Sequence, residues 1–308
     1  MRTTSAADRE KQGISVVVPT LNRGSYLINT LHDLLAQEHR PLEVLVVDQS
    51  NGEDRDLLSL VREHPNVVSY HKVAFRGLPL ARNYGWQRAR YEAIIFVDDD
   101  IRCGPSLATQ HLRGLSQPNI GIVAGAIDEG VSSKKNTRLT GHFNSWTATP
   151  VRSFESTTDC LVRHAAGCNF SAWRAVLEAA GGFDEALAVG AALYEETELC
   201  LRVQQCGLDI YFNGNARLQH LAAENGGCRV PDLPRYIWSL AHNRAILIER
   251  NLRWFKVPVA CFRLFLLFIS YAMAYQSLDV FQPGMAGLLT GFRAGKNPPS
   301  CGNYKVRA

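Results

Sequence analysis

Residues 93–100 read AIIFVDDD, an apolar run followed directly by three carboxylates. An unbroken run of β-branched and aromatic residues is typical of a strand buried on both faces of a parallel sheet. Ligands of open α/β folds bind outside the carboxyl ends of such strands, where Asp98, Asp99 and Asp100 are expected. Adjacent like charges resist burial unless a cation compensates them, and carboxylate oxygens suit Mg²⁺ or Mn²⁺. The stretch therefore predicts a metal site; the alternative is a solvated acidic turn.

Strand–loop–helix units precede and surround this stretch. Apolar runs that end in polar loops alternate with leucines or valines at helical spacing. The expected elements are strands at 14–18, 42–47, 67–71 and 93–97, with helices around 27–35, 57–61 and 78–90. Consecutive units of this kind predict an α/β protein with a mostly parallel sheet, flanking helices and right-handed crossovers.

Short motifs recur in a fixed order along the chain. They read VPTLNR at 18–23, VD at 47–48, Gly77 with ARN at 81–83, FVDDD at 96–100, AGCNF at 166–170, GGFDE at 181–185 and YEETELCLR at 194–202. In this order they resemble glycosyltransferase family 2, whose members use nucleotide sugars. Ordered matches are more specific than any single motif. The resemblance implies a GT-A-like (Rossmann-like) fold and an inverting, metal-dependent, hexosyltransferase-type reaction without a covalent enzyme intermediate.

The resemblance also implies roles on the donor side. Asp100 is expected to bind the cation, Asp98 to contact the ribose or reach the metal through water, and Asp48 to accept a hydrogen bond from the nucleobase. The nucleotide-sugar site would be completed by Pro19, Thr20, Asn22, Arg23 and Asp99. A divalent cation stabilises the negative charge on a departing diphosphate, which explains why the site needs carboxylates.

Three further residues carry two readings each. Arg82 is expected to pair with phosphate, because a guanidinium offers a planar fork of donors, or to be a surface arginine of a helix. Asn83 would contact the nucleotide or cap the loop. His220 would complete the metal shell or be a structural histidine between apolar neighbours.

The family's usual Glu-Asp base motif is Glu195-Glu196 here. By position Glu196 is the expected general base for the acceptor hydroxyl, and Glu195 is the alternative if the assignment slips by one residue. Glutamate is one methylene longer than aspartate, so the backbone must lie slightly further from the acceptor hydroxyl for the carboxylate to reach its proton, or the acceptor must differ. Without a catalytic role, both would be exposed carboxylates that favour the N-terminal dipole of a helix.

Composition sets the boundaries. A length of 308 residues is long for one compact domain and predicts a catalytic domain followed by a C-terminal region. The resemblance implies that the GT-A-like catalytic domain covers 13–230, with a nucleotide-binding half at 13–125 and a sugar and acceptor half at 126–230, and the helical, membrane-associating region then covers 231–308. The net charge of +4, without a stripe of basic and aromatic residues, gives no support for nucleic-acid binding. The eight cysteines form no C-x-x-C pair and the polar start has no signal peptide, which fits the cytoplasm. Residues 1–12 are expected to be disordered and Ser132–Arg138 to form a mobile loop.

The tail carries a membrane signal. Residues 257–275 are almost wholly apolar and approach the length of a membrane span. Pro258 and Arg263 fall in the first half of this segment, which favours a helix lying in the membrane interface with its arginine reaching the headgroups. A true span and a buried or homo-oligomer-forming helix are the alternatives.

The resemblance thus implies an enzyme that uses a nucleotide sugar, with a UDP- or dTDP-sugar expected. Its acceptor would be a saccharide or lipid-linked saccharide of cell-surface polysaccharide synthesis, at the inner face of the cell membrane. A nucleotidyltransferase would need a basic glycine-rich loop after the first strand, which residues 19–22 do not supply. A nucleotide-sugar-binding scaffold would not need Glu196.

Overall fold

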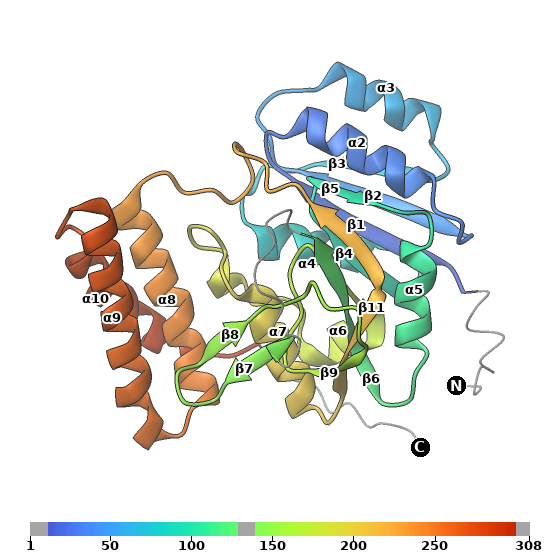
Figure 1. Cartoon of the computed structure of the whole chain (residues 1–308). Coiled ribbons are helices and arrows are strands. Elements are labelled where there is room, and N and C mark those ends of the chain that lie inside the picture. Colours follow the sequence, from blue (N-terminus) through green and yellow to red (C-terminus); the bar gives the residue numbers. More distant parts are fainter. Residues whose placement is uncertain (1–11, 129–138, 300–308) are drawn as a thin grey trace.

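The computed structural model describes residues 12–128 and 139–299 (Figure 1). The predicted disorder at the N-terminus concerns residues that lie outside this part, apart from Gln12. The predicted mobile loop Ser132–Arg138 also lies outside the described residues.

A mixed, mostly parallel sheet forms the centre of the molecule (Figure 1). Its strands are β1 (Ile14–Thr20), β2 (Leu42–Asp48), β3 (Val68–Lys72), β4 (Ala93–Val97), β5 (Ile101–Cys103), β6 (Ile120–Asp128), β9 (Cys160–Val162), β10 (Asn169–Trp173) and β11 (Asp209–His220). Among the described residues their order is β3-β2-β1-β4-β10-β6-β11-β5, and β9 pairs with β11.

The predicted parallel half is confirmed. Strands β1, β2, β3 and β4 pair in parallel, and all of β1, β2 and β4 is buried, as their apolar runs require. Beyond β4 the pattern changes, because β10 enters antiparallel between β4 and β6. This insertion brings the segment before β10 alongside the residues that follow β4.

Helices cover the sheet on both sides. They are α2 (Gly24–Leu35), α3 (Arg55–Glu63), α4 (Leu78–Arg88), α5 (Leu107–Leu115), α6 (Arg174–Ala180) and α7 (Glu195–Gln205). The chain moves outward from β1 to β3 and then returns to β4, so right-handed crossovers place α2 and α3 on one face and α4 on the other (Figure 1). The loops after β1, β2 and β4 consequently open at one edge of the sheet.

Three helices follow the sheet and form a layer beside it (Figure 1). They are α8 (Leu233–Asn251), α9 (Val257–Tyr275) and α10 (Phe281–Gly295), with the short turn η3 (Trp254–Lys256) before α9. Helix α10 packs closely along α8 because Gly287 and Gly291 face it; a Cβ at Gly291 would lie 2.2 Å from the carbonyl oxygen of His242. Ion pairs of 2.7 Å from Arg250 of α8 to Asp184 and Glu198 hold this layer against the sheet domain.

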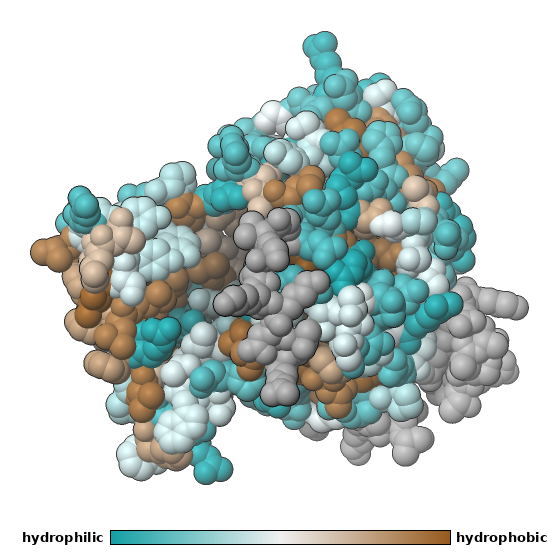
Figure 2. Space-filling model, in the orientation of Figure 1, coloured by the Kyte–Doolittle hydropathy of each residue, from teal (hydrophilic) through white to brown (hydrophobic). Residues whose placement is uncertain are grey.

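Helix α9 leaves most of its apolar surface uncovered. Its buried residues are Ala260, Leu264 and Phe268, which form one stripe. Residues Trp254–Tyr275 form a helix that is long and apolar enough to cross a membrane, and 22% of its most apolar stretch is buried in the protein. Figure 2 shows apolar side chains gathered over α9 and α10. The large exposed ones are Trp254, Phe255, Val259, Phe262, Phe265, Leu266, Met273, Tyr275, Leu278, Met285 and Leu289, which we call the apolar face. The predicted apolar helical extension at the C-terminal side is therefore present.

Candidate active site

Asp100 and His220 meet where β4 and β11 end. The antiparallel register of β5 and β11 sets His220 opposite Ile101, next to Asp100. Oδ1 of Asp100 is buried and lies 3.3 Å from Nε2 of His220, so when this ring nitrogen carries no proton the oxygen has no hydrogen-bond donor among the described residues. Its Oδ2 accepts a hydrogen bond from the backbone N–H of Ala223 at 2.8 Å. A buried acceptor without a donor is costly, and two ligand atoms that face each other in this way fit a divalent cation.

The pKa shifts of Asp100 and His220 are both set by charged neighbours that outweigh the effect of burial. Burial alone would raise the pKa of Asp100, but His220 and Arg23 outweigh burial and hold it below its usual value. Burial would likewise lower the pKa of His220, yet Asp100 and Asp98 raise it. The carboxylates favour a positive charge at His220, and a metal ion at this point would supply that charge in place of the proton.

The three adjacent carboxylates divide into different environments. The Asp98 side chain is 28% exposed; its Oδ1 accepts a hydrogen bond from Arg82 at 3.2 Å, and its Oδ2 lies 3.9 Å from Nε2 of His220. Asp99 is buried, accepting hydrogen bonds from Thr20 at 2.6 Å and Arg23 at 2.9 Å. Burial raises the pKa of Asp99 to about 6, against the opposing effect of those two partners. Asp98 and Asp100 thus lie toward His220, and Asp99 anchors the loop after β1.

A pocket of about 160 Å³ opens between the ends of β1 and β2. Four predicted residues line it, namely Thr20, Asn22, Arg23 and Asp48, together with Gly24, Leu27, Ser50, Gly52, Glu53, Asp54 and Leu57. Pro19 is buried in β1 beside this pocket. The structure therefore brings most of the predicted nucleotide residues to one place.

Asp48 is held ionised within this pocket. It accepts hydrogen bonds from the hydroxyl of Tyr70 at 2.6 Å, from Lys72 at 2.8 Å and from the backbone N–H of Ser50 at 2.8 Å. Burial would raise the pKa of Asp48, but these donors outweigh it and lower the pKa. Lys72 and Tyr70 were not predicted as site residues. The β2–β3 register, in which Asp48 lies opposite Lys72, was the signal for the lysine.

Arg82 is a buried organising residue and not a surface arginine. Its side chain is fully buried and donates to Glu195, to Asp98 and, at 2.8 Å, to the carbonyl oxygen of Gly167. The guanidinium also lies 5.6 Å from the ring centroid of Phe170. These contacts join α4, α7 and the segments after β4 and before β10, so the charge of Arg82 serves the protein's own carboxylates.

Asn83 clamps the GGFDE turn. Its Oδ1 accepts hydrogen bonds from the backbone N–H of Phe183 at 2.9 Å and from the indole of Trp86 at 3.0 Å. Its Nδ2 donates to the carbonyl oxygen of Phe183 at 2.9 Å. The side chain is thus used within the protein, as the loop-capping alternative predicts.

Glu195 and Glu196 have different surroundings although they are adjacent. Glu195 is buried and paired with Arg82, and its Oε2 has no hydrogen-bond partner among the described residues. Glu196 is half-buried and accepts a hydrogen bond from the hydroxyl of Thr197 at 3.2 Å. The prediction of two exposed carboxylates is wrong for Glu195. Of the two, Glu196 is the more exposed.

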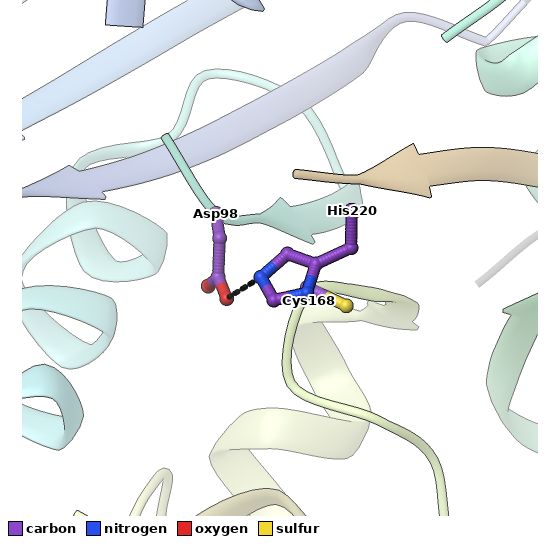
Figure 3. Close-up of side chains that lie close together, drawn as sticks. All are labelled: Asp98, Cys168 and His220. Carbon is purple, nitrogen blue, oxygen red and sulfur yellow. Dashed lines mark ion pairs between the residues drawn. The ribbon is translucent and has the colours of Figure 1, made fainter. Parts of the chain in front are cut away.

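Cys168 is a neighbour of the site that sequence reasoning left without a role. It lies in the AGCNF motif just before β10, and its sulfur is close to Asp98 and His220 (Figure 3). No local sequence pattern indicates this position, because it depends on the β10–β4 pairing, which sets Asn169 opposite Val97 and hence Cys168 beside Asp98.

A larger cavity of about 390 Å³ lies elsewhere, between α7, α8 and the end of α10. It contains none of the predicted site residues. Two of its arginines, Arg202 and Arg250, pair with Glu198 at 2.6 and 2.7 Å. This cavity belongs to the interface that holds the C-terminal helices.

Comparisons with known proteins agree with this geometry. Residues 15–180 match the family model described as Glycosyl transferase family 2. An uncharacterized glycosyltransferase of Rickettsia felis is 31% identical over 88 residues, which are 28% of this chain and 14% of that protein, so the match spans a small part of that relative's length. The glucosyl-dolichyl phosphate glucuronosyltransferase of Haloferax volcanii is 25% identical over 215 residues, covering 67% of this chain and 68% of that protein.

A solved structure shares the fold. The crystal structure of GalNAc-T7 with UDP, GalNAc and Mn²⁺ superposes with a TM-score of 0.60 at 19% identity, over 78% of this chain and 50% of that one. The predicted GT-A-like fold is confirmed by this likeness together with the observed sheet.

Proposed function

The chain belongs to glycosyltransferase family 2, and on this basis we propose that it transfers a sugar, with inversion, from a UDP- or dTDP-sugar to a saccharide hydroxyl. The observation that carries the proposal is the buried Oδ1 of Asp100, which faces Nε2 of His220 at 3.3 Å and has no other donor among the described residues. This feature lies beside the pocket at Asp48, as a diphosphate site joined to a nucleoside site requires.

The residues fit Mg²⁺ or Mn²⁺. Asp100 and His220 would hold the cation, with Asp98 binding directly or through water. When bound, such a cation stabilises the negative charge that develops on the leaving diphosphate. The Mn²⁺ in GalNAc-T7 supports a divalent cation in a protein of this fold.

The donor would be oriented by the pocket between β1 and β2. Asp48 would accept a hydrogen bond from the nucleobase, because its ionised carboxylate keeps lone pairs beyond those that Tyr70, Lys72 and Ser50 use. Arg23 would bring positive charge toward the diphosphate, since its guanidinium already spans Asp99 and Asp100 at 2.9 Å each. Asp99 would act from beneath by holding Thr20 and Arg23.

Glu196 would act on the acceptor. Its carboxylate would take the proton of the acceptor hydroxyl while that oxygen bonds to the anomeric carbon and the bond to the diphosphate breaks. One displacement from the opposite face inverts the anomeric carbon and leaves no sugar on the enzyme. Glu195 would contribute by holding Arg82 in place.

We place the acceptor at the inner face of the cell membrane, as a lipid-linked saccharide of surface-polysaccharide synthesis. The Haloferax relative supports a lipid-linked acceptor, because its name specifies glucosyl-dolichyl phosphate. The apolar face supports peripheral binding, since Phe262 and Leu266 are exposed while Arg253, Lys256 and Arg263 lie close by in sequence to meet anionic headgroups.

The decisive experiment separates donor binding from catalysis. Purified protein is screened for hydrolysis of nucleotide sugars with Mn²⁺, and Glu196→Gln is then compared with Glu178→Gln, an exposed glutamate of α6. We expect Glu196→Gln to keep the wild-type donor affinity, as measured by calorimetry. Its rate of sugar transfer should fall by a factor of about 10² to 10⁴. If Glu196→Gln retains full rate while Glu195→Gln loses rate but keeps wild-type thermal unfolding and donor affinity, Glu195 is the base. A protein that binds donors but turns none over, with or without saccharide acceptors, would be a binding scaffold.

A further inference from the structure

Three ligand atoms of different chemical softness converge beside the proposed cation site (Figure 3). They are a carboxylate oxygen of Asp98, the sulfur of Cys168 and a ring nitrogen of His220, and all lie within 4.8 Å of one another. A set of oxygen, sulfur and nitrogen donors is typical of Zn²⁺ sites, whereas Mg²⁺ takes oxygen ligands almost exclusively.

The sheet itself creates this convergence. Pairing of β10 with β4 carries Cys168 to Asp98, and pairing of β11 with β5 carries His220 to the same edge. Cys168 is also well positioned, because the next residue, Asn169, donates at 2.8 Å to the carbonyl oxygens of Ala126 and Ala216. The three donors therefore come from rigid strand ends.

An ion could reach this cluster from solvent. Cys168 is buried, but the side chains of Asp98 and His220 are 28% and 20% exposed, so the cluster is open on their side. Arg82 hydrogen-bonds to Oδ1 of Asp98, and Oδ2 is the oxygen that points toward His220. A metal ion could thus join these residues without breaking the Arg82 contact.

We propose that Asp98, Cys168 and His220 form a thiolate-containing site for Zn²⁺ and similar ions, Co²⁺ and Cd²⁺ included. Binding would release the thiol proton of Cys168 to solvent. For nitrogen and sulfur ligands Zn²⁺ ranks above Mn²⁺ in affinity, so Zn²⁺ would displace the hard cation that shares Asp98 and His220. Inhibition of transfer by Zn²⁺ rests on the proposed function; metal binding by the cluster does not.

The binding test uses metal-free full-length protein and no sugar donor. Titration with Cd²⁺ or Co²⁺ is followed by the ultraviolet charge-transfer absorption that only a thiolate–metal bond produces. We expect one equivalent to saturate the signal in the wild type, and Cys168→Ser to abolish it. Cys168→Ser should also weaken Zn²⁺ binding by more than about tenfold, since losing even an outer hydrogen-bond partner of a ligand costs that much.

Cys228→Ser is the matched control. Cys228 is a half-buried cysteine near Asp98 and Arg82, and desolvation raises the pKa of its thiol to about 11. This variant should keep the charge-transfer signal. A signal that persists in Cys168→Ser, disappears in Cys228→Ser or is absent from the wild type would overturn the site. Thermal unfolding of each variant, and Cys168→Ala as a second substitution, ensure that a lost signal is not a lost fold.

A second measurement concerns inhibition. Zn²⁺ should inhibit Mn²⁺-supported donor hydrolysis in the wild type, and Cys168→Ser should need more than about tenfold more Zn²⁺ for equal inhibition. Equal inhibition of both proteins would reject the competition. If no donor is hydrolysed at all, the proposed function fails while the spectroscopic result still decides the metal site.

Discussion

Arg82 and Glu195 form an ion pair that is buried on both sides and joins α4 to the first turn of α7. The same guanidinium donates to Asp98 and to the carbonyl oxygen of Gly167. One side chain therefore sets the positions of the acidic loop, the segment that carries Cys168 and the helix that carries Glu196.

Arg82→Met should be strongly destabilising. It would leave Glu195 as a buried carboxylate without its partner, which costs about 3 to 5 kcal/mol in comparable pairs. Urea unfolding measures the loss. Arg88→Met on the exposed face of α4 is the control and should stay within about 0.5 kcal/mol of the wild type. The double variant Arg82→Met with Glu195→Met should recover part of the loss, and strictly additive effects would contradict the coupling.

Asp100→Asn should weaken metal-dependent donor binding, and its thermal unfolding is measured alongside because Asp100 also pairs with Arg23 at 2.9 Å. The amide is a poorer ligand than the carboxylate, and we expect affinity for Mn²⁺ with nucleotide to fall by more than about tenfold, as measured by calorimetry. Asp56→Asn, on an exposed helical turn, should bind as the wild type does. An unchanged titration for Asp100→Asn would remove Asp100 from the metal site.

His111 should make folding stability depend on pH. It is fully buried, and its ring nitrogens contact Ser171 at 2.9 Å and the carbonyl oxygen of the Asn169 side chain at 2.8 Å. Burial lowers the pKa of His111 from 6.5 to about 4, so between these values the unfolded chain binds a proton that the folded chain does not. The contribution of His111 to the free energy of unfolding is therefore constant above pH 6.5. It decreases as the pH falls toward 4, by up to roughly 3 kcal/mol.

Denaturant unfolding between pH 7 and 4 tests this effect. His111→Gln removes the titrating ring, so its free energy of unfolding should depend less steeply on pH over this range than that of the wild type. The same measurement on His39→Gln, a half-buried histidine bound to one carbonyl oxygen, controls for the substitution of a histidine by glutamine. Equal slopes for the wild type and His111→Gln would contradict the assignment.

Phe262→Glu should reduce membrane binding. The Phe262 side chain is 63% exposed on the apolar face, and full burial of such a side chain contributes roughly 1.5 to 3 kcal/mol. Flotation with anionic vesicles measures the bound fraction. Leu161→Glu is a matched control, because Leu161 is 64% exposed on β9, outside the apolar face.

Two other outcomes of the flotation experiment would be informative. A wild-type protein that ignores vesicles and elutes as a dimer, with Phe262→Glu restoring the monomer, would assign the apolar face to an oligomer interface. If the wild-type protein stays on the vesicles after a high-salt wash and is released only by detergent, the segment spans the membrane.

Local sequence patterns predicted the parallel half of the fold closely. The strand expected at 93–97 is observed as Ala93–Val97, and the one expected at 42–47 as Leu42–Asp48. The ends of these strands can be predicted because each apolar run is bounded by a polar loop. The helix expected over 78–90 ends at Arg88, where Ala89 leaves helical geometry.

The rest depends on contacts between distant residues. Insertion of β10 between β4 and β6 is set by tertiary packing, which no local periodicity records. For the same reason the sequence could place Arg82 on a helix but could not reveal that Glu195, 113 residues away, would bury it. Cys168 acquires its neighbours only through that insertion.

The ion pairs of Arg250 with Asp184 and Glu198 have a consequence for acceptor choice. They fix α8, and with it the apolar face, in one orientation relative to the sheet edge that carries Asp100. A protein seated on a bilayer through that face would carry its reaction centre at a constant height above the lipid surface. The distance between Glu196 and the lipid surface would then set a minimum length for the acceptor. A lipid-linked saccharide shorter than this distance would remain unmodified, whatever its sugars are.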